Sequence, residues 1–168
     1  MVLERIESLL SIKKGYFVIF LLVAVDLVAK YIAEQSLNFG QPVPLIPIVD
    51  FLLVFNSGIA FSILDFNNSF LSFALSLIGL LIVGYLHSLY KNEESQINRI
   101  SLILIISGAL GNILDRLADG VVTDFLFFHV GDTSFFIFNF ADAFISIGAA
   151  IFFLMSLKNF FKIGLNED

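Results

Sequence analysis

Long runs of apolar residues, separated by shorter polar stretches, organise the whole chain. The runs extend approximately over residues 16–33, 70–90, 100–117 and 138–157. Each is close to the ~20 residues that a helix needs to cross a hydrocarbon core of about 30 Å. The pattern therefore predicts four transmembrane helices, which would leave both ends of the chain on the same side of the membrane.

Two connections between these spans carry a different pattern. Residues 34–69 are too long and too apolar for a plain linker, and residues 48–64 are rich in Val, Ile, Leu and Phe, which is typical of strands. In the connection 118–137, residues 120–126 are also more strand-like than helical. We therefore expect one domain over 1–168, a mainly helical membrane protein with a small sheet-like platform.

Composition agrees with a membrane protein. Of the 168 residues, 58% are hydrophobic and only 14% are charged, which excludes an ordinary soluble domain. The net charge of -6 matters less than where the charges lie. No cysteine is present, which excludes disulfides and thiolate chemistry on this chain. The first apolar run contains two charged residues and no small-residue cleavage motif, so we expect it to be a retained span and not a cleaved signal peptide.

The distribution of Lys and Arg predicts the orientation, because basic residues are enriched in short cytoplasmic loops. The connections 34–69 and 118–137 contain no Lys or Arg. Basic residues instead precede the first span, separate the second and third, and follow the fourth, at Arg5, Lys13, Lys14, Lys91, Arg99, Lys158 and Lys162. Both termini are thus expected in the cytoplasm, and the two Lys- and Arg-free connections outside.

Six ionisable residues remain near the outer ends of the spans. They are Asp26, Lys30, Asp115, Arg116, Asp124 and Asp142. A charge inside a bilayer costs roughly 2.5–3.5 kcal/mol on insertion scales, so each needs a partner or a function. The predicted topology brings all six to one depth in the outer leaflet.

Some of these residues have a purely structural interpretation. Asp26 and Lys30 are four positions apart on a helix and can neutralise each other. Asp115 and Arg116 could form an ordinary helix-end pair that reaches toward the interface. For Arg116 a function is favoured, because Asn112 lies one turn before it and upstream glycines permit close helix packing.

Asp124 and Asp142 can meet if the connection between the last two spans folds back on itself. Taken singly, Asp124 could be a turn residue and Asp142 a helix-start residue stabilised by the helix dipole. As a close pair in a low-dielectric site they could not easily both ionise, so one would keep a proton. The ionised member could then take a proton from water while the protonated member polarises a carbonyl, which is the chemistry of aspartic proteases.

Five ordered motifs resemble those of the lipoprotein signal peptidases, also called signal peptidase II. The motifs are Asp26 with Lys30, Asn56-Ser57-Gly58-Ile59-Ala60-Phe61, Gly108-Ala109-Leu110-Gly111-Asn112-Ile113-Leu114-Asp115-Arg116, Val122-Thr123-Asp124-Phe125, and Phe138-Asn139-Phe140-Ala141-Asp142. The resemblance covers nearly the whole chain.

The resemblance implies a membrane-embedded aspartic endopeptidase that removes the signal peptide from prolipoproteins, cutting before a diacylglyceryl-modified cysteine. It implies Asp124 and Asp142 as the catalytic pair. It implies substrate-positioning or dyad-orienting roles for Asn56, Gly58, Asn112, Arg116 and Asn139, and structural support from Asp26, Lys30, Gly108, Gly111, Asp115 and Ala141.

The family fold is four transmembrane helices with an outer β-cradle formed largely by the first outer connection. The resemblance also implies a bacterial cytoplasmic membrane location with the active site near the outer leaflet, no metal or organic cofactor, and inhibition by the cyclic peptide globomycin. The expected partners are prolipoprotein substrates and membrane lipids. We expect no nucleic-acid partner, and a monomer.

The chain departs from the family at two neighbours of the motif aspartates, with Leu27 where a polar residue is common and Ala143 where Ser is common. Both departures affect hydrogen bonding around the motif. Two other classes of function stay open on the residues alone. A small ion- or proton-coupled transporter would also need buried charges, but its path should continue through the cytoplasmic half, where only His87 is a candidate. A non-catalytic scaffold would leave the two aspartates without a task.

Overall fold

The computed structural model describes residues 2–57 and 69–164. Within these ranges the chain forms four helices, α1 Val2–Ser36, α2 Ser69–Asn92, α3 Gln96–Asp119 and α4 Phe140–Gly164. Each contains a stretch long and apolar enough to cross a membrane. The predicted helical membrane fold is confirmed, although the first and third helices extend farther toward the sheet than the predicted spans.

The helices begin and end where the local sequence directs. Ser95 caps α3 by accepting a hydrogen bond from the backbone N–H of Asn98. At the other end Gly120 adopts φ 82°, and its N–H donates to the carbonyl of Arg116 at 2.9 Å. A left-handed residue of this kind suits glycine and ends the helix. The chain therefore leaves α3 in a fixed direction, directly into the strand that carries Asp124.

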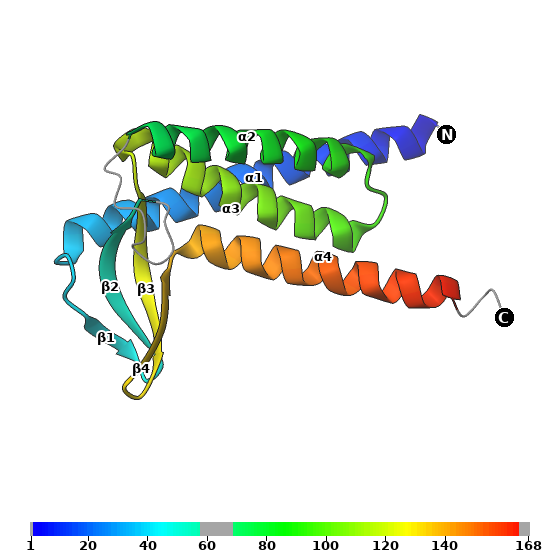
Figure 1. The fold of residues 1–168 in the computed structure, drawn as a ribbon. Coiled ribbons are helices and arrows are strands. Elements are labelled where there is room, and N and C mark those ends of the chain that lie inside the picture. The colour runs from blue at the N-terminus through cyan, green and yellow to red at the C-terminus, as the bar shows by residue number, and fades with distance from the viewer. Residues whose placement is uncertain (1, 58–68, 165–168) are drawn as a thin grey trace.

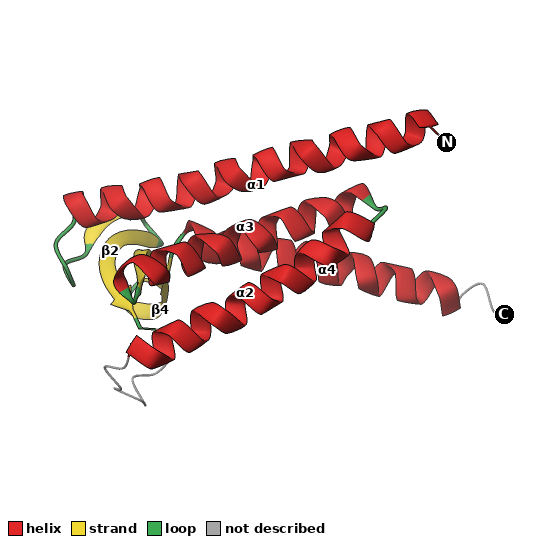
Figure 2. Ribbon diagram, turned by 90° about the horizontal axis from the view of Figure 1, so that it is seen from above, coloured by secondary structure: helices red, strands yellow, loops and turns green. Residues whose placement is uncertain are grey.

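Helix α3 lies at the centre of the bundle and packs against each of the other helices. Figure 2 shows α1 running alongside it, with the sheet at one end. Its contact with α4 is close because small residues face each other there: a Cβ on Gly108 would collide with the backbone oxygen of Ala141. Small residues at helix contacts are the usual means of close packing in a bilayer. This contact sets the depth at which α4 begins.

A four-stranded antiparallel sheet, in the order β1-β2-β3-β4, completes the part of the chain that the structure describes. Its strands are β1 Val43–Ile46, β2 Val49–Asn56, β3 Val122–Val130 and β4 Thr133–Phe138. Two strands come from each outer connection, which corrects the expectation that the first connection forms most of the cradle. The apolar strand β2 pairs with β3, which belongs to the second connection, and this pairing satisfies the backbone hydrogen bonds along that edge of β2.

The sheet extends from one end of the bundle, while α1 starts and α4 finishes at the opposite end (Figure 1). The interior is unusual for its polarity, since Asp26, Lys30 and Asn139 are at most 1% exposed. Large apolar side chains such as Phe20 and Leu81 are instead more than 65% exposed. This inside-out arrangement suits a protein whose solvent is lipid.

Candidate active site

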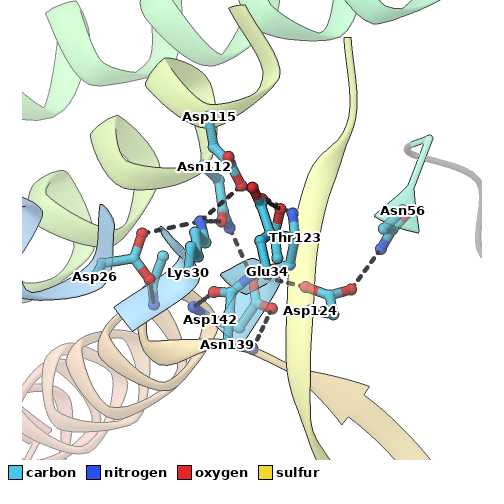
Figure 3. Close-up of polar contacts among 11 residues, drawn as sticks. Asp26, Lys30, Glu34, Asn56, Asn112, Asp115, Thr123, Asp124, Asn139 and Asp142 are labelled. Carbon is cyan, nitrogen blue, oxygen red and sulfur yellow. Dashed lines mark hydrogen bonds and ion pairs between the residues drawn. The ribbon is translucent and has the colours of Figure 1, made fainter. Parts of the chain in front are cut away.

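Asp124 and Asp142 are brought together by the strand pair that links α3 to α4. Asp124 is the third residue of β3 and is 3% exposed, whereas Asp142 lies half-buried in the first turn of α4. Because β3 and β4 are antiparallel, the hairpin returns the chain to the level at which β3 began. Two carboxyl groups that are 18 positions apart in sequence thus meet beside the end of the bundle (Figure 3).

Asn139 connects the two carboxyl groups. Its Nδ2 donates to Oδ1 of Asp124 at 2.6 Å, and its Oδ1 accepts the backbone N–H of Asp142 at 3.0 Å. The backbone N–H of Asn139 in turn donates to Oδ2 of Asp142 at 3.2 Å. The last two bonds form a reciprocal cap at the start of α4. One buried amide therefore fixes both the helix start and the spacing of the carboxyl groups.

A second amide reaches Asp142 from α3. Asn112 donates from Nδ2 to Oδ1 of Asp142 at 2.8 Å, and its Oδ1 accepts from Nζ of Lys30 at 2.8 Å. Figure 3 shows these two hydrogen bonds in series, from the ammonium group of Lys30 through the amide of Asn112 to the carboxylate of Asp142. The sequence interpretation placed Lys30 with Asp26 as structural support, and it did not include this link to Asp142.

Lys30 lies between two buried carboxylates. Its Nζ is 2.8 Å from Oδ2 of Asp26, four positions earlier on α1, and 3.3 Å from Oδ2 of Asp115 on α3. Asp26 also accepts the backbone N–H of Ala141 at 2.8 Å, which joins α1 to the start of α4. Asp115 accepts the backbone N–H of Thr123 at 2.8 Å. Asp115 is therefore a buried residue. This rules out the interpretation that Asp115 forms an exposed helix-end pair with Arg116.

The remaining candidates surround Asp124. Asn56, at the end of β2, donates from Nδ2 to Oδ2 of Asp124 at 3.1 Å. Arg116 is half-buried and interacts electrostatically with Asp115, Asp124 and Asp142; its Nε is buried and has no hydrogen-bond partner among the described residues. Gly58 lies outside the described residues. Gly111 lies against Asp26, where a Cβ would be 2.5 Å from the carboxylate.

Two residues of this cluster, Thr123 and Glu34, were given no role in the sequence interpretation. The hydroxyl of Thr123 donates to Oε1 of Glu34 at 2.6 Å, so the residue before Asp124 is held by α1 as well as by Asp115. Glu34 was assigned to a connection, but α1 continues to Ser36. The available signal was the spacing of Asp26, Lys30 and Glu34, since residues four apart share one helix face.

Burial raises the pKa of Asp124 from 3.8 to about 6. The amide donors of Asn56 and Asn139 oppose this increase, and the nearby charge of Asp142 adds to it. A carboxyl group with this pKa can hold a proton close to neutral pH. Paired with a second carboxyl group, it has the properties of an acid and base pair.

An apolar cavity of about 260 Å³ lies close by, on the α1 side of β3, with Phe51, Phe125 and Phe140 among its lining residues. Successive strand residues point to opposite faces, so Phe125 lines this cavity while Asp124 does not. Within the described residues, no group of three or more His, Cys, Asp or Glu side chains is arranged to hold a metal ion. The chemistry that this site offers is that of carboxyl and amide groups.

Comparison with known proteins identifies relatives over most of the chain. The family model described as "Signal peptidase (SPase) II" matches residues 18–158. A lipoprotein signal peptidase of Bartonella tribocorum is 37% identical over 159 residues, which cover 93% of this chain and 92% of the relative. A lipoprotein signal peptidase of Brucella ovis is 37% identical over 145 residues, 86% of this chain and 89% of the relative.

Two solved structures share the fold, both described as bacterial membrane enzymes studied by the in meso method. The first, at 2.3 Å resolution, has a TM-score of 0.76 at 26% identity and covers 88% of this chain and 90% of its own. The second, at 1.9 Å, has a TM-score of 0.76 at 27% identity, with 88% of this chain and 94% of the other covered.

Proposed function

The chain belongs to the signal peptidase II family, which makes it a multi-pass peptidase of the bacterial membrane that removes signal peptides from prolipoproteins, and we propose that it does so as an aspartic endopeptidase. Asp124 and Asp142 are the catalytic pair, and the bond cut precedes a diacylglyceryl-modified cysteine. The observation that supports this proposal is the single buried amide, Asn139, that is hydrogen-bonded to both residues.

The proposed reaction is hydrolysis by one ionised and one protonated carboxyl group. The ionised carboxylate removes a proton from a water molecule as the water oxygen bonds to the scissile carbonyl carbon. The protonated carboxyl gives its proton to the carbonyl oxygen, which yields a neutral tetrahedral diol. When the C–N bond breaks, the first carboxyl returns its proton to the leaving nitrogen, and the second takes one from the diol. Both groups end as they began.

Polar groups around the pair are suited to orient an extended peptide. We assign Asn56, Gly58, Asn112, Arg116 and Asn139 to this task. Asn56, Asn112 and Asn139 already donate to the two carboxyl groups, which keeps those groups in position. Arg116 has a buried Nε with no hydrogen-bond partner among the described residues, and a substrate carbonyl oxygen is a suitable acceptor for it. No metal or organic cofactor takes part in this scheme.

The site is proposed to face the outer leaflet, with both termini in the cytoplasm. Basic residues support this orientation, because the start of α1, the α2–α3 connection and the end of α4 lie opposite the sheet (Figure 1). Lys13, Lys91 and Lys158 belong to the sequence in or next to these segments. A substrate anchored by two acyl chains would hold its scissile bond near the membrane surface, at the level of the pair. The chain is further proposed to act as a single domain over 1–168 and as a monomer.

A transporter remains the alternative from another class. A proton or ion path would need polar groups through the full thickness of the bundle. At the end away from the sheet a buried hydrophobic cluster contains Tyr90, Leu102 and Ile106. The buried hydroxyls of Ser101 and Ser107 donate to carbonyl groups of their own helix. Among the described residues the buried charged side chains are Asp26, Lys30, Asp115 and Asp124, and this distribution favours a site that opens at one end only.

The cleavage position tests the proposal. The purified protein is incubated with a diacylglyceryl-modified prolipoprotein, and the products are analysed by mass spectrometry. We expect a mature product that starts at the lipid-bearing cysteine, and no cutting of the same substrate without lipid. Equal cleavage of the lipid-free substrate would contradict the proposed substrate class.

A further inference from the structure

We propose that Asp142 is the resting base and Asp124 the proton-bearing acid, and that Lys30 enforces this division as a positioning residue acting through Asn112. The inference rests on the proposed aspartic peptidase function and assigns the two roles within it. The inference follows from which atoms donate and which accept hydrogen bonds in the series Lys30, Asn112, Asp142 and Asn139.

Lys30 fixes the orientation of the Asn112 amide. An ammonium group has three donors and no acceptor, so the Asn112 atom 2.8 Å from Nζ must be the carbonyl oxygen Oδ1. The amide nitrogen is then the atom that faces Oδ1 of Asp142, at 2.8 Å. If the amide were turned over, its NH₂ group would face the ammonium group of Lys30, and neither group could accept a hydrogen bond. The buried ammonium therefore makes Asn112 a permanent donor to Asp142.

The other oxygen of Asp142 also faces a donor that cannot reverse. Oδ2 accepts the backbone N–H of Asn139, and the carboxylate lies in the first turn of α4, where the helix dipole favours negative charge. Hydrogen bonds to the charged form of a carboxyl stabilise that form. Asp142 thus has a fixed donor on each oxygen, and both favour the carboxylate.

The charged groups around this carboxylate come from three elements. Lys30 and Asp26 belong to α1, Asp115 and Arg116 to α3, and Asp124 to β3. Lys30 is shared between Asp26 and Asp115 and reaches Asp142 only through Asn112. Its effect on Asp142 is therefore carried by the polarity of one amide.

Asp124 also has a donor on each oxygen, but only one of the two is fixed. The amide of Asn139 is also fixed, because its Oδ1 accepts the backbone N–H of Asp142, so its Nδ2 must face Oδ1 of Asp124. Oδ2 of Asp124 accepts from Nδ2 of Asn56, a side-chain amide that presents its oxygen as the acceptor when it is turned over. The proton of Asp124 is therefore assigned to Oδ2, with the Asn56 amide turned. Among the described residues neither Asp124 nor Asp142 has an ammonium or guanidinium group within ion-pair distance, and the charges of Lys30 and Arg116 act on Asp124 at longer range. Burial raises the pKa of Asp124 to about 6, so this carboxyl group holds its proton at pH values below that.

Infrared spectroscopy of the full-length protein, with aspartate ¹³C-labelled at the carboxyl carbon, tests the assignment without using activity. Spectra are taken at about pH 5, below the pKa of Asp124, for wild type, Asp124→Asn and Asp142→Asn. We expect Asp124→Asn to lose a protonated-carboxyl band that Asp142→Asn retains. Loss of that band in Asp142→Asn and its retention in Asp124→Asn would reverse the two roles and overturn the proposal.

The role of Lys30 is tested with Asp26→Asn/Lys30→Met, which removes one buried charge of each sign and so keeps the net buried charge of wild type. Asp26→Asn is the reference for the loss of Asp26, because it keeps Lys30 and its bond to Asn112. For the double variant relative to the reference, we expect kcat to fall about 10-fold or more, KM to change less than about threefold, and the acidic limb of the pH–rate profile to move to higher pH. An unchanged acidic limb would mean that Lys30 only supports the structure, which would contradict its proposed role.

A second variant keeps the test informative if the double variant does not fold. Asn112→Asp preserves the size of the side chain and its contact with Lys30, but it places an acceptor against Asp142. We expect the same upward move of the acidic limb, with the helical circular dichroism of wild type. A wild-type limb in Asn112→Asp would contradict the polarity argument. These outcomes are separable from failure of the proposed function, which would appear as cleavage by Asp124→Asn or Asp142→Asn.

Discussion

Asn139 and Asp142 are bonded to each other in both directions, the backbone N–H of each donating to the side chain of the other at 3.2 and 3.0 Å. The same Asn139 side chain donates to Asp124. The start of α4 and the spacing of the carboxyl pair are therefore one structural feature. A change in this cap should affect the fold and the chemistry together.

Asn139→Ala tests this connection. Loss of an N-cap costs about 1 kcal/mol, while loss of a pre-positioned donor at a catalytic group costs roughly 100-fold in rate. We expect a slightly lower melting temperature and a fall in cleavage of about that size. Prolipoprotein cleavage and a circular dichroism melt in detergent measure the two effects.

Ser95→Ala is the matched control. Ser95 caps α3, at the end of the bundle away from the sheet. It should lower the melting temperature by a similar amount and leave cleavage at the wild-type level. Equal losses of cleavage in both variants would mean that Asn139 acts only through helix stability.

The pH dependence of stability reports on Asp124. A carboxyl group whose pKa rises on folding stabilises the protein at pH values below its unfolded pKa, and this contribution is lost as the pH rises through the folded pKa. For Asp124 the window runs from 3.8 to about 6, and roughly 1.4 kcal/mol per pH unit gives a total of about 3 kcal/mol. Asp124→Asn cannot ionise and should gain stability relative to wild type across this window.

Melting temperatures of wild type and Asp124→Asn at several pH values check this expectation. The difference between them should grow from pH 4 to pH 7. Asp132→Asn removes an exposed carboxylate from the turn between β3 and β4 and should show no comparable trend. A constant difference between Asp124→Asn and wild type would contradict the buried, proton-holding Asp124.

Gly108 sets the distance between α3 and α4. A methyl group there would meet the backbone oxygen of Ala141, next to Asp142, so Gly108→Ala should force the helices apart. We expect a lower melting temperature and reduced kcat. Gly84→Ala on α2 is the control, because its Cβ would meet nothing within 4 Å and alanine favours a helix by about 1 kcal/mol. A melting temperature for Gly108→Ala equal to that of Gly84→Ala would count against the close contact.

The sequence predicted the membrane spans because their signal is long and local. It also brought Asp26, Lys30, Asp124 and Asp142 to one end of the bundle, through span direction alone. Which strand pairs with which was not predictable, since the β2–β3 contact joins residues as distant as Val49 and Phe128. Such pairing depends on tertiary packing and leaves little trace in local pattern.

The hydrogen bonds of the site could also not be predicted from the sequence. Glu34 was missed because a helix end is poorly marked where the chain passes from lipid to the interface, and α1 runs on to Ser36. The bond from Lys30 to Asn112 joins residues 82 positions apart. It depends on how closely α1 approaches α3, which composition does not encode.

Cleavage of a diacylglyceryl-modified prolipoprotein by Asp124→Asn and by Asp142→Asn tests the central claim most directly. Asparagine keeps the shape of each side chain but cannot exchange the proton that hydrolysis needs. We predict no detectable mature product from either variant, with the circular dichroism spectrum of wild type. Wild-type cleavage by either folded variant would contradict the assignment of Asp124 and Asp142 as the catalytic pair.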